Sequence, residues 1–184
     1  MNLTPFSVRL WGWESLPLFT YRKKQNMTSK TATLPTHSEA KTAFDSALSA
    51  FVDSQPIAEA DLQTAFKGIT NSLTIRDYAL GAVGYGISDD SDRFAFLNLF
   101  SVCGESADIE AILSAYFYEA ENMAEAKAHL QKAFEINPSH SLSTLLNRVF
   151  SAGWPSGAFA TMRNELHAKV IEQIQADSEV KVGE

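Results

Sequence analysis

Four histidines and one cysteine are the residues in this sequence with the widest capacity for catalysis and metal binding. A metal site in a helical protein needs several such residues at short, regular spacing, as in an HExxH helix. No spacing of that kind occurs, and the sequence predicts no metal site, no cofactor and no catalytic residue. We expect the histidines to be ordinary surface residues, with the first in a flexible leader: His37, His129, His140 and His167.

Two further segments contain residue types associated with chemistry. Cys103 lies among apolar neighbours in the segment FLNLFSVCG, which predicts a buried and unreactive thiol. The glycine-rich segment GAVGYG, residues 81–86, looks at first like a phosphate-binding loop. Such loops follow a strand and begin a helix, whereas this segment follows a helical pattern. We therefore expect a helix terminus that packs closely against a neighbouring element.

Arg76 and Asp77 form the most notable polar pair. Adjacent residues on a helix do not face each other, so we expect them to bond to different partners. In this interpretation Asp77 caps or pairs with the next helix, and Arg76 binds carbonyl groups at a helix end. The alternative is an arginine that binds a ligand.

Two aromatic residues are candidates for an interaction surface. Trp154, in the segment GWP, is expected to fill the core beneath a turn, although an exposed anchor for a partner is the alternative. The three consecutive aromatics at 116–118 cannot all face one core, and Tyr118 is expected to point toward solvent or a second chain.

The elements that position these residues are all helical, because apolar residues recur every three or four positions and no segment alternates with period two. THSE, residues 36–39, has the spacing of a capping box that begins the first helix. The fold class predicted is all-α, a single compact domain of about seven to eight helices. After the first helix, the expected helical segments are 54–69, 71–86, 89–104, 106–120, 122–138, 139–153 and 155–177.

The predicted domain spans residues 36–176, between a leader at 1–35 and a disordered tail at 177–184. The leader differs in composition from the rest: it holds two of the three tryptophans, and its apolar run is too interrupted for a signal peptide. It is either a mobile or partner-binding tail or a misassigned start, with translation beginning at Met27.

The segments at 106–120 and 122–138 together resemble one tetratricopeptide hairpin. Leu113, Ser114 and Phe117 match its first helix; Ala126, Leu130 and Ala133, followed by Pro138, match its second. No comparable unit occurs one period, about 34 residues, to either side. A solenoid needs about three units, so we expect one hairpin in another fold and no peptide-binding solenoid.

Charge restricts the classes of partner. The chain has a net charge of −7, and because residues 1–26 carry +3, the remainder carries −10. So acidic a body repels phosphate backbones, which makes nucleic acid an unfavoured partner. No segment reaches the ~18 apolar residues of a membrane span. A single cysteine fits a reducing compartment, and we expect a cytoplasmic protein.

The order of features from Asp61 to Trp154 resembles the C-terminal helical part of an uncharacterised actinobacterial family, domain of unknown function 4192. The matching features are Ile75-Arg76-Asp77, the alanine-rich helix pair that ends at Pro138, and the segment SLSTLLNRVFSAGWP. The chain departs from the family in lacking both a glycine in the helix-pair turn and the α/β portion of longer members. The resemblance implies a host and a fold but no reaction, and it suits an accessory gene on a mobile element.

These observations predict a small cytoplasmic helical protein, more plausibly non-catalytic than an enzyme, that acts by binding a protein partner or by self-association. The alternative is a nucleic-acid-related accessory, acting as an acidic decoy or through basic residues near Arg148 and Arg163. An enzyme with a dispersed site is the third hypothesis, which would require a polar pocket around Arg76 or a histidine.

Overall fold

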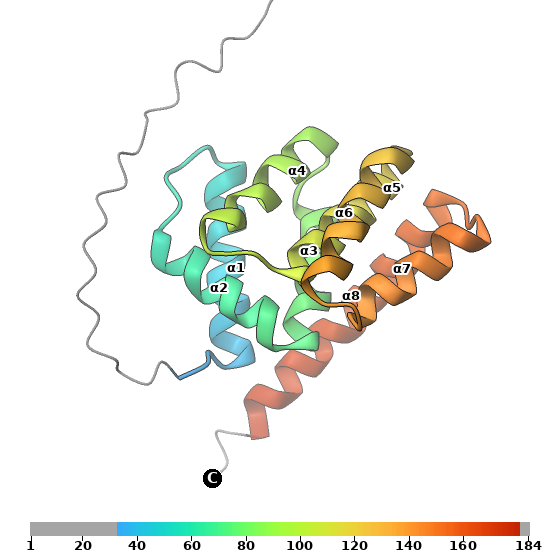
Figure 1. Cartoon of the computed structure of the whole chain (residues 1–184). Helices are drawn as coiled ribbons and strands as arrows, with labels where there is room; N and C mark the ends of the chain where they lie inside the picture. Colours follow the sequence, from blue (N-terminus) through green and yellow to red (C-terminus); the bar gives the residue numbers. More distant parts are fainter. Residues whose placement is uncertain (1–32, 181–184) are drawn as a thin grey trace, which may run out of the picture. The chain divides into compact units, whose positions relative to one another are not determined.

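The computed structural model describes residues 33–180, which form an all-α arrangement of eight α-helices and one short 3-10 helix without any strand (Figure 1). The expected leader lies outside the described residues except for positions 33–35, as do positions 181–184 of the expected tail. The elements are α1 (His37–Val52), α2 (Glu59–Asn71), α3 (Leu73–Gly86), α4 (Asp90–Asn98), η2 (Leu99–Val102), α5 (Ala107–Glu119), α6 (Met123–Ile136), α7 (Ser141–Ala152) and α8 (Ser156–Val180).

Side-chain caps set most of the helix boundaries. The predicted capping box is confirmed: the Thr36 hydroxyl accepts from the Glu39 amide, and the Glu39 carboxylate accepts from the Thr36 amide. At its C-terminus α7 ends at Gly153, which has a φ of 64°, a conformation that glycine adopts without strain. The second helical segment, expected at 54–69, begins later than predicted, because α2 starts at Glu59. Side-chain N-caps also begin α3, α4, α5 and α6 at Ser72, Asp89, Ser106 and Asn122.

A cluster of aromatic rings joins α1, α3, α4 and η2. Phe44 on α1 is fully buried, with its ring edge-on to Phe96 at 5.6 Å and stacked on Phe100 at 6.0 Å. Tyr78 of α3 meets the same ring edge-on at 6.1 Å. Such pairs contribute roughly 0.5–1.5 kcal/mol each beyond the area that they bury. The alanines and Phe44 that repeat along α1 therefore form its core face, as the spacing predicts.

The helices α5 and α6 pack as a close antiparallel hairpin. Ser114 of α5 is fully buried, and its hydroxyl donates to the carbonyl of Ala126 on α6 at 2.7 Å. Leu130 and Ala133 continue the buried face of α6. Small residues at the contact allow the two helices to approach closely, as the hairpin pattern predicts. That this hairpin belongs to the tetratricopeptide type stays a prediction.

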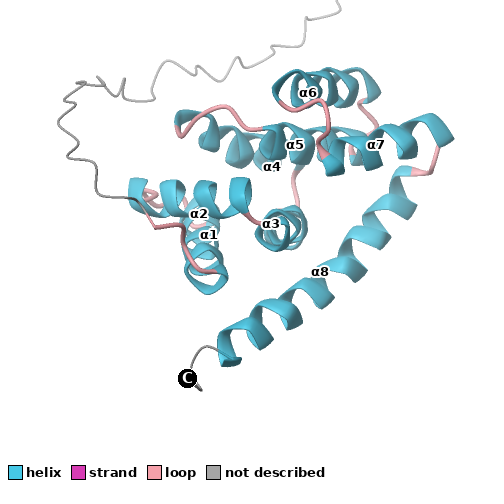
Figure 2. Cartoon of the chain, turned by 60° about the horizontal axis from the view of Figure 1, so that its bottom comes forward, coloured by secondary structure: helices cyan, strands magenta, loops and turns pink. Residues whose placement is uncertain are grey.

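The long helix α8 runs past α3, as Figure 2 shows, and it packs against both α3 and α1. Its buried apolar residues are Phe159, Val170 and Ile174. Near its end, Asp177 forms an ion pair with His37 at the start of α1, at 2.9 Å. The helix α8 continues to Val180, beyond the predicted domain end at 176.

Glycines on α3 make room for two α8 side chains that are bulky and polar. A Cβ at Gly81 would lie 2.5 Å from the Cβ of His167, with ring atoms closer still, and one at Gly84 would overlap the guanidinium of Arg163. The glycine-rich segment at 81–86 is thus the last turns of α3 in close contact with a neighbouring helix, as predicted. Among residues 33–180, no helix has both the length and the apolar character needed to cross a membrane.

Replacing Gly81 by Ala is expected to destabilise the fold. The new methyl group would overlap both the ring and the Cβ of His167, and overpacking of this kind costs about 1–3 kcal/mol. The measurement is the free energy of unfolding in urea, followed by circular dichroism.

Gly157→Ala is the matched control, because a Cβ at Gly157 meets no atom within 4 Å. This substitution in the first turn of α8 is expected to be neutral or stabilising by up to about 1 kcal/mol. Equal effects of the two substitutions would contradict the close contact between α3 and α8.

Candidate functional site

The sequence predicts that Arg76 and Asp77 bond to different partners, but in the structure they bond to each other. Arg76 is buried, and its Nε and Nη2 both donate to Asp77 Oδ1, at 2.8 and 2.6 Å. Its Nη1 donates to the hydroxyl of Ser141 on α7 at 3.0 Å. The prediction fails because the arginine side chain is long enough to fold back along its own helix to the next carboxylate. Arg76 therefore ties α3 to the first turn of α7.

A second set of polar bonds lies beside this arginine, where the N-terminal ends of α3, α5 and α7 meet. Asp108 Oδ1 of α5 lies 2.9 Å from His140 Nε2 and 4.0 Å from Arg76 Nη1. His140 Nδ1 lies 2.8 Å from the Ser143 hydroxyl and accepts from the Ser143 amide at 3.3 Å. Because Nδ1 accepts from an N–H, the ring proton belongs on Nε2, which donates to Asp108.

This Asp108–His140–Ser143 network has the connectivity of a catalytic triad, in which a carboxylate orients an imidazole that activates a hydroxyl nucleophile. Its surroundings prevent that chemistry. Ser143 has no exposed surface and His140 is buried, so no substrate can approach the hydroxyl in this conformation. The Nδ1 lone pair is also shared with the Ser143 amide, which makes His140 the N-cap of α7. The network is a helix cap and an inter-helix joint.

Two openings adjoin these residues. A polar depression of about 500 Å³ is open to solvent and includes Asn71 and Asn137, together with Arg76 and His140. On the other side of Arg76, a smaller groove of about 200 Å³ is mainly apolar, and α7 and α8 supply most of its lining: Leu142, Leu145, Phe159, Met162 and Leu166. The charged groups at both openings are already bonded to one another, so neither opening presents a free catalytic group.

The expectation for Tyr118 is wrong. Its side chain is 5% exposed, stacks on Phe150 with ring centres 4.5 Å apart, and donates its hydroxyl to the carbonyl of Trp154. All three consecutive aromatics find partners because helices surround α5 on several sides. Tyr116 reaches Leu80 on α3, while Phe117 stacks between Phe94 of α4 and His129 of α6.

Trp154 does not fill the core beneath the turn, contrary to the preferred interpretation. Its side chain is 46% exposed. Tyr118 and Phe150 fill the space beneath this turn instead, and the bond from Tyr118 holds the Trp154 backbone. The indole is therefore free to contact a partner, as in the alternative interpretation.

The histidines are not chance surface residues. His37 belongs to α1 rather than a flexible leader, and its ring bonds both Asp177 of α8 and Ser72, the N-cap of α3, at 2.9 Å each. His129 bonds Glu110 across the α5–α6 hairpin at 2.6 Å. The sequence does not indicate these roles, because the partners of His37 and His129 lie far from them along the chain. Among the described residues, no three His, Cys, Asp or Glu side chains lie together as a metal site would require.

The environments predicted for Cys103 and Arg163 also differ from those in the structure. Cys103 is half-buried rather than buried, and burial, followed by the charge of Glu59, raises the pKa of its thiol. This shift keeps the thiol protonated and weakly nucleophilic. Arg163 cannot belong to a basic surface patch, because it is buried and forms a bidentate ion pair with Glu119, at 2.7 and 2.9 Å.

His167 is the one buried side chain of the described region with a polar atom, Nδ1, that lacks a hydrogen-bond partner. Its ring lies between those of Tyr78 and Tyr85, with centres 5.1 Å from each. Burial lowers the pKa of this imidazole, and the charge of Arg163 lowers it further, whereas Asp45 acts in the opposite direction. The neutral imidazole is therefore the form that suits the packing of α8 on α3.

Comparison of the chain with models of protein families, with curated proteins and with solved structures finds no match. The resemblance to the actinobacterial family stays a prediction.

His140→Ala is expected to destabilise the fold by about 1–2 kcal/mol, because α7 loses its N-cap and Asp108 loses its histidine partner. His140→Asn is the informative comparison, since asparagine is a favoured N-cap and can accept from the Ser143 amide. We expect Asn to recover a large part of the loss in urea unfolding. No difference between Ala and Asn would contradict the capping role.

The lowered pKa of His167 makes stability depend on pH. The unfolded state binds the proton more readily than the folded state, so stability falls as pH drops below the ordinary value of 6.5 and levels off below the folded pKa. His167→Gln is expected to weaken this dependence when unfolding free energies are measured from pH 7.5 to 5. His37→Gln, at an ion-paired histidine, is the comparison. An unchanged pH profile in His167→Gln would contradict the assignment.

Proposed function

We propose that this protein is a non-catalytic helical module of the cytoplasm that binds a positively charged partner protein. The observation that carries the proposal is the charge of the described surface. The chain has 22 acidic and 15 basic residues; two of the acids and six of the bases lie outside residues 33–180, so the described part carries a formal charge of −11. Of its remaining bases, four are already in ion pairs: Lys41, Arg76, Arg93 and Arg163.

A protein partner fits this surface better than a small substrate does. The same acidic region also has exposed large apolar side chains, including Val52, Leu145, Trp154 and Leu166. Protein interfaces combine apolar and aromatic anchors with a polar rim, and opposite charges accelerate the encounter. Self-association, which the sequence also allows, is opposed by the repulsion between two copies of so acidic a surface.

The second candidate is an acidic decoy, whose partner would be the basic face of a nucleic-acid-binding protein. The same surplus of acidic residues favours it, because a surface of this sign imitates the charge of a phosphate backbone. Direct binding of nucleic acid is disfavoured for the same reason, and the burial of Arg163 removes one of the two residues expected in a basic patch. A host among the actinobacteria and an origin on a mobile element are part of the proposal and rest on the family resemblance alone.

The full chain, immobilised and exposed to an actinobacterial lysate treated with nuclease, is expected to retain proteins of high isoelectric point. Their release should become complete as salt rises, because interactions between exposed charges are screened within about 8 Å at physiological ionic strength. The measurement is mass spectrometry of each salt fraction, with an immobilised acidic protein of unrelated fold as the control. Retention of nucleic acid alone, or of nothing specific beyond the control, would contradict the proposal. Release by added DNA would favour the decoy.

A further inference from the structure

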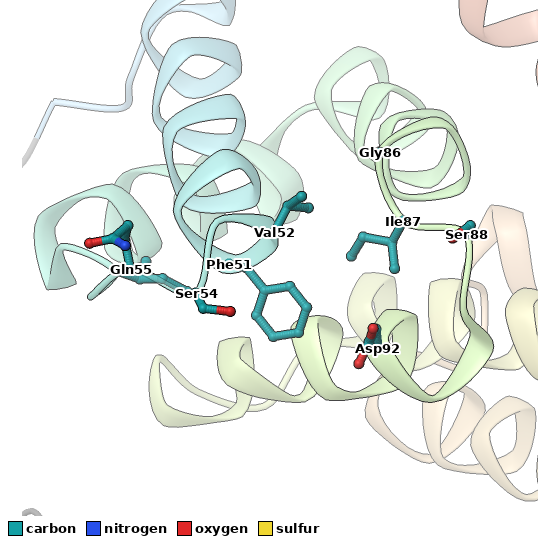
Figure 3. A pocket seen from close by; sticks show the side chains of 9 residues that line it. Phe51, Val52, Ser54, Gln55, Gly86, Ile87, Ser88 and Asp92 are labelled. Carbon is teal, nitrogen blue, oxygen red and sulfur yellow. The ribbon is translucent and has the colours of Figure 1, made fainter.

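A solvent-open pocket of about 420 Å³ lies where the C-terminal ends of α1 and α3 meet the first turn of α4 (Figure 3). The side chains of Phe51, Val52 and Ile87 project into it, and the Ser54 hydroxyl and the Asp92 carboxylate lie at its edge. Hereafter we call it the Val52–Asp92 pocket. It is separate from the Arg76–His140 network, with which it shares no lining residue.

The floor of the Val52–Asp92 pocket is apolar and firmly held. Phe51 packs on the buried ring of Phe96, with centres 5.3 Å apart, and Ile87 is buried. The loop after α1 is fixed by two backbone bonds, Gln55 N–H to Ala50 O at 2.7 Å and Ser54 N–H to Phe51 O at 3.1 Å. Val52 is nevertheless 53% exposed. An apolar side chain on a rigid backbone is a preformed contact surface, so binding there loses little conformational entropy.

The charges around the pocket have one sign. Asp92 lines it, and Asp53 and Asp89 are exposed next to lining residues. The carbonyl ends of α1 and α3 add partial negative charge at the same place. No ion pair within residues 33–180 involves any of the three acids.

Arg93, the cation that follows Asp92 in the sequence, is already bonded within the fold. Its Nε donates to Ile87 O and its Nη1 to Asp90 Oδ1, each at 2.7 Å, and its guanidinium lies over the ring of Tyr116 at 5.5 Å. Asp90 is therefore neutralised, whereas Asp92, on the same turn of α4, is not. The N-terminus of α4 offsets part of this negative charge, but no cation within residues 33–180 forms an ion pair with Asp92.

We infer that the Val52–Asp92 pocket receives a segment of the partner protein in which an arginine or lysine stands next to an apolar side chain. The apolar group would contact Val52, Phe51 and Ile87, and the cation would lie on Asp92. This inference rests on the proposed function and specifies its partner chemistry. Charge complementarity selects this occupant: a phosphate or a second copy of the acidic surface would be repelled, and a wholly apolar segment would leave Asp92 without a partner.

The probe is an acetylated and amidated Leu-Arg-Leu-Arg peptide, titrated into the isotopically labelled full chain. We expect amide chemical shifts to change at Val52, Ser54, Ile87 and Asp92, with few changes elsewhere. An analogue with citrulline in place of arginine removes the charge and keeps the shape. An analogue with serine in place of leucine removes the apolar contact. Each analogue should bind more weakly.

Asp92→Asn should weaken binding of the arginine peptide about two- to fivefold, the range of an exposed ion pair. Its control, Glu125→Gln, removes an exposed acid from the first turn of α6 and reduces the net negative charge equally. Val52→Thr should also weaken binding, whereas Val102→Thr, at a valine that is 74% exposed in η2, should not.

The inference is overturned if the citrulline peptide binds as tightly as the arginine peptide, if shifts spread evenly over the acidic surface, or if Glu125→Gln matches Asp92→Asn. The proposed function fails separately. If the unmodified chain retains no cationic protein, the function is wrong. If Asp92→Asn and Val52→Thr retain cationic proteins at the same salt as the unmodified chain, the function stands and the assignment to this pocket is wrong.

Discussion

The ion pair between Arg163 of α8 and Glu119 of α5 is the interaction on which the arrangement of the last helix depends. Both side chains are nearly inaccessible, at 5% and 7% exposure, and burying two charges costs several kcal/mol per ion unless other polar groups help. That help comes from the bidentate geometry and from the Tyr116 ring, 5.3 Å from the guanidinium. Gly84 leaves the space in which this guanidinium lies. The two charges can therefore pair in this geometry only when α8 lies at one position along α3.

Fixing α8 at that position has consequences at the other end of the described region. Four residues after Arg163, His167 meets Gly81, and further along Val170 and Ile174 are buried. Asp177 then reaches His37 at the start of α1, and His37 in turn bonds the N-cap of α3. Through these contacts α8 connects α1 to α5, which are distant in sequence.

The sequence predicts the helical elements well because their signals are local. Capping residues such as Thr36 and Asn122, together with the three-to-four spacing of apolar residues, act within one or two turns. It fails for Tyr118, Trp154 and His140, because their environments depend on which helices surround them. Tyr118 is buried only because α7 and α8 fold over α5. The glycines of α3 indicate close packing in the sequence, but they do not identify α8 as the neighbour.

The contrast between the two ends of the helices supports the proposal that this protein binds a partner. At the N-terminal ends of α3, α5 and α7, His140 bonds Asp108, which lies 4.0 Å from Arg76, and the network is closed to solvent at Ser143. Around the C-terminal ends of α1 and α3, the helix dipoles are negative and the neighbouring side chains are acidic as well, since α4 begins there with Asp89, Asp90 and Asp92. Asp89, Asp90 and Asp92 lie at the N-terminus of α4, and among residues 33–180 only Asp90 has a cationic partner. The excess charge therefore points outward beside exposed Val52, where no cation of the described residues pairs with it.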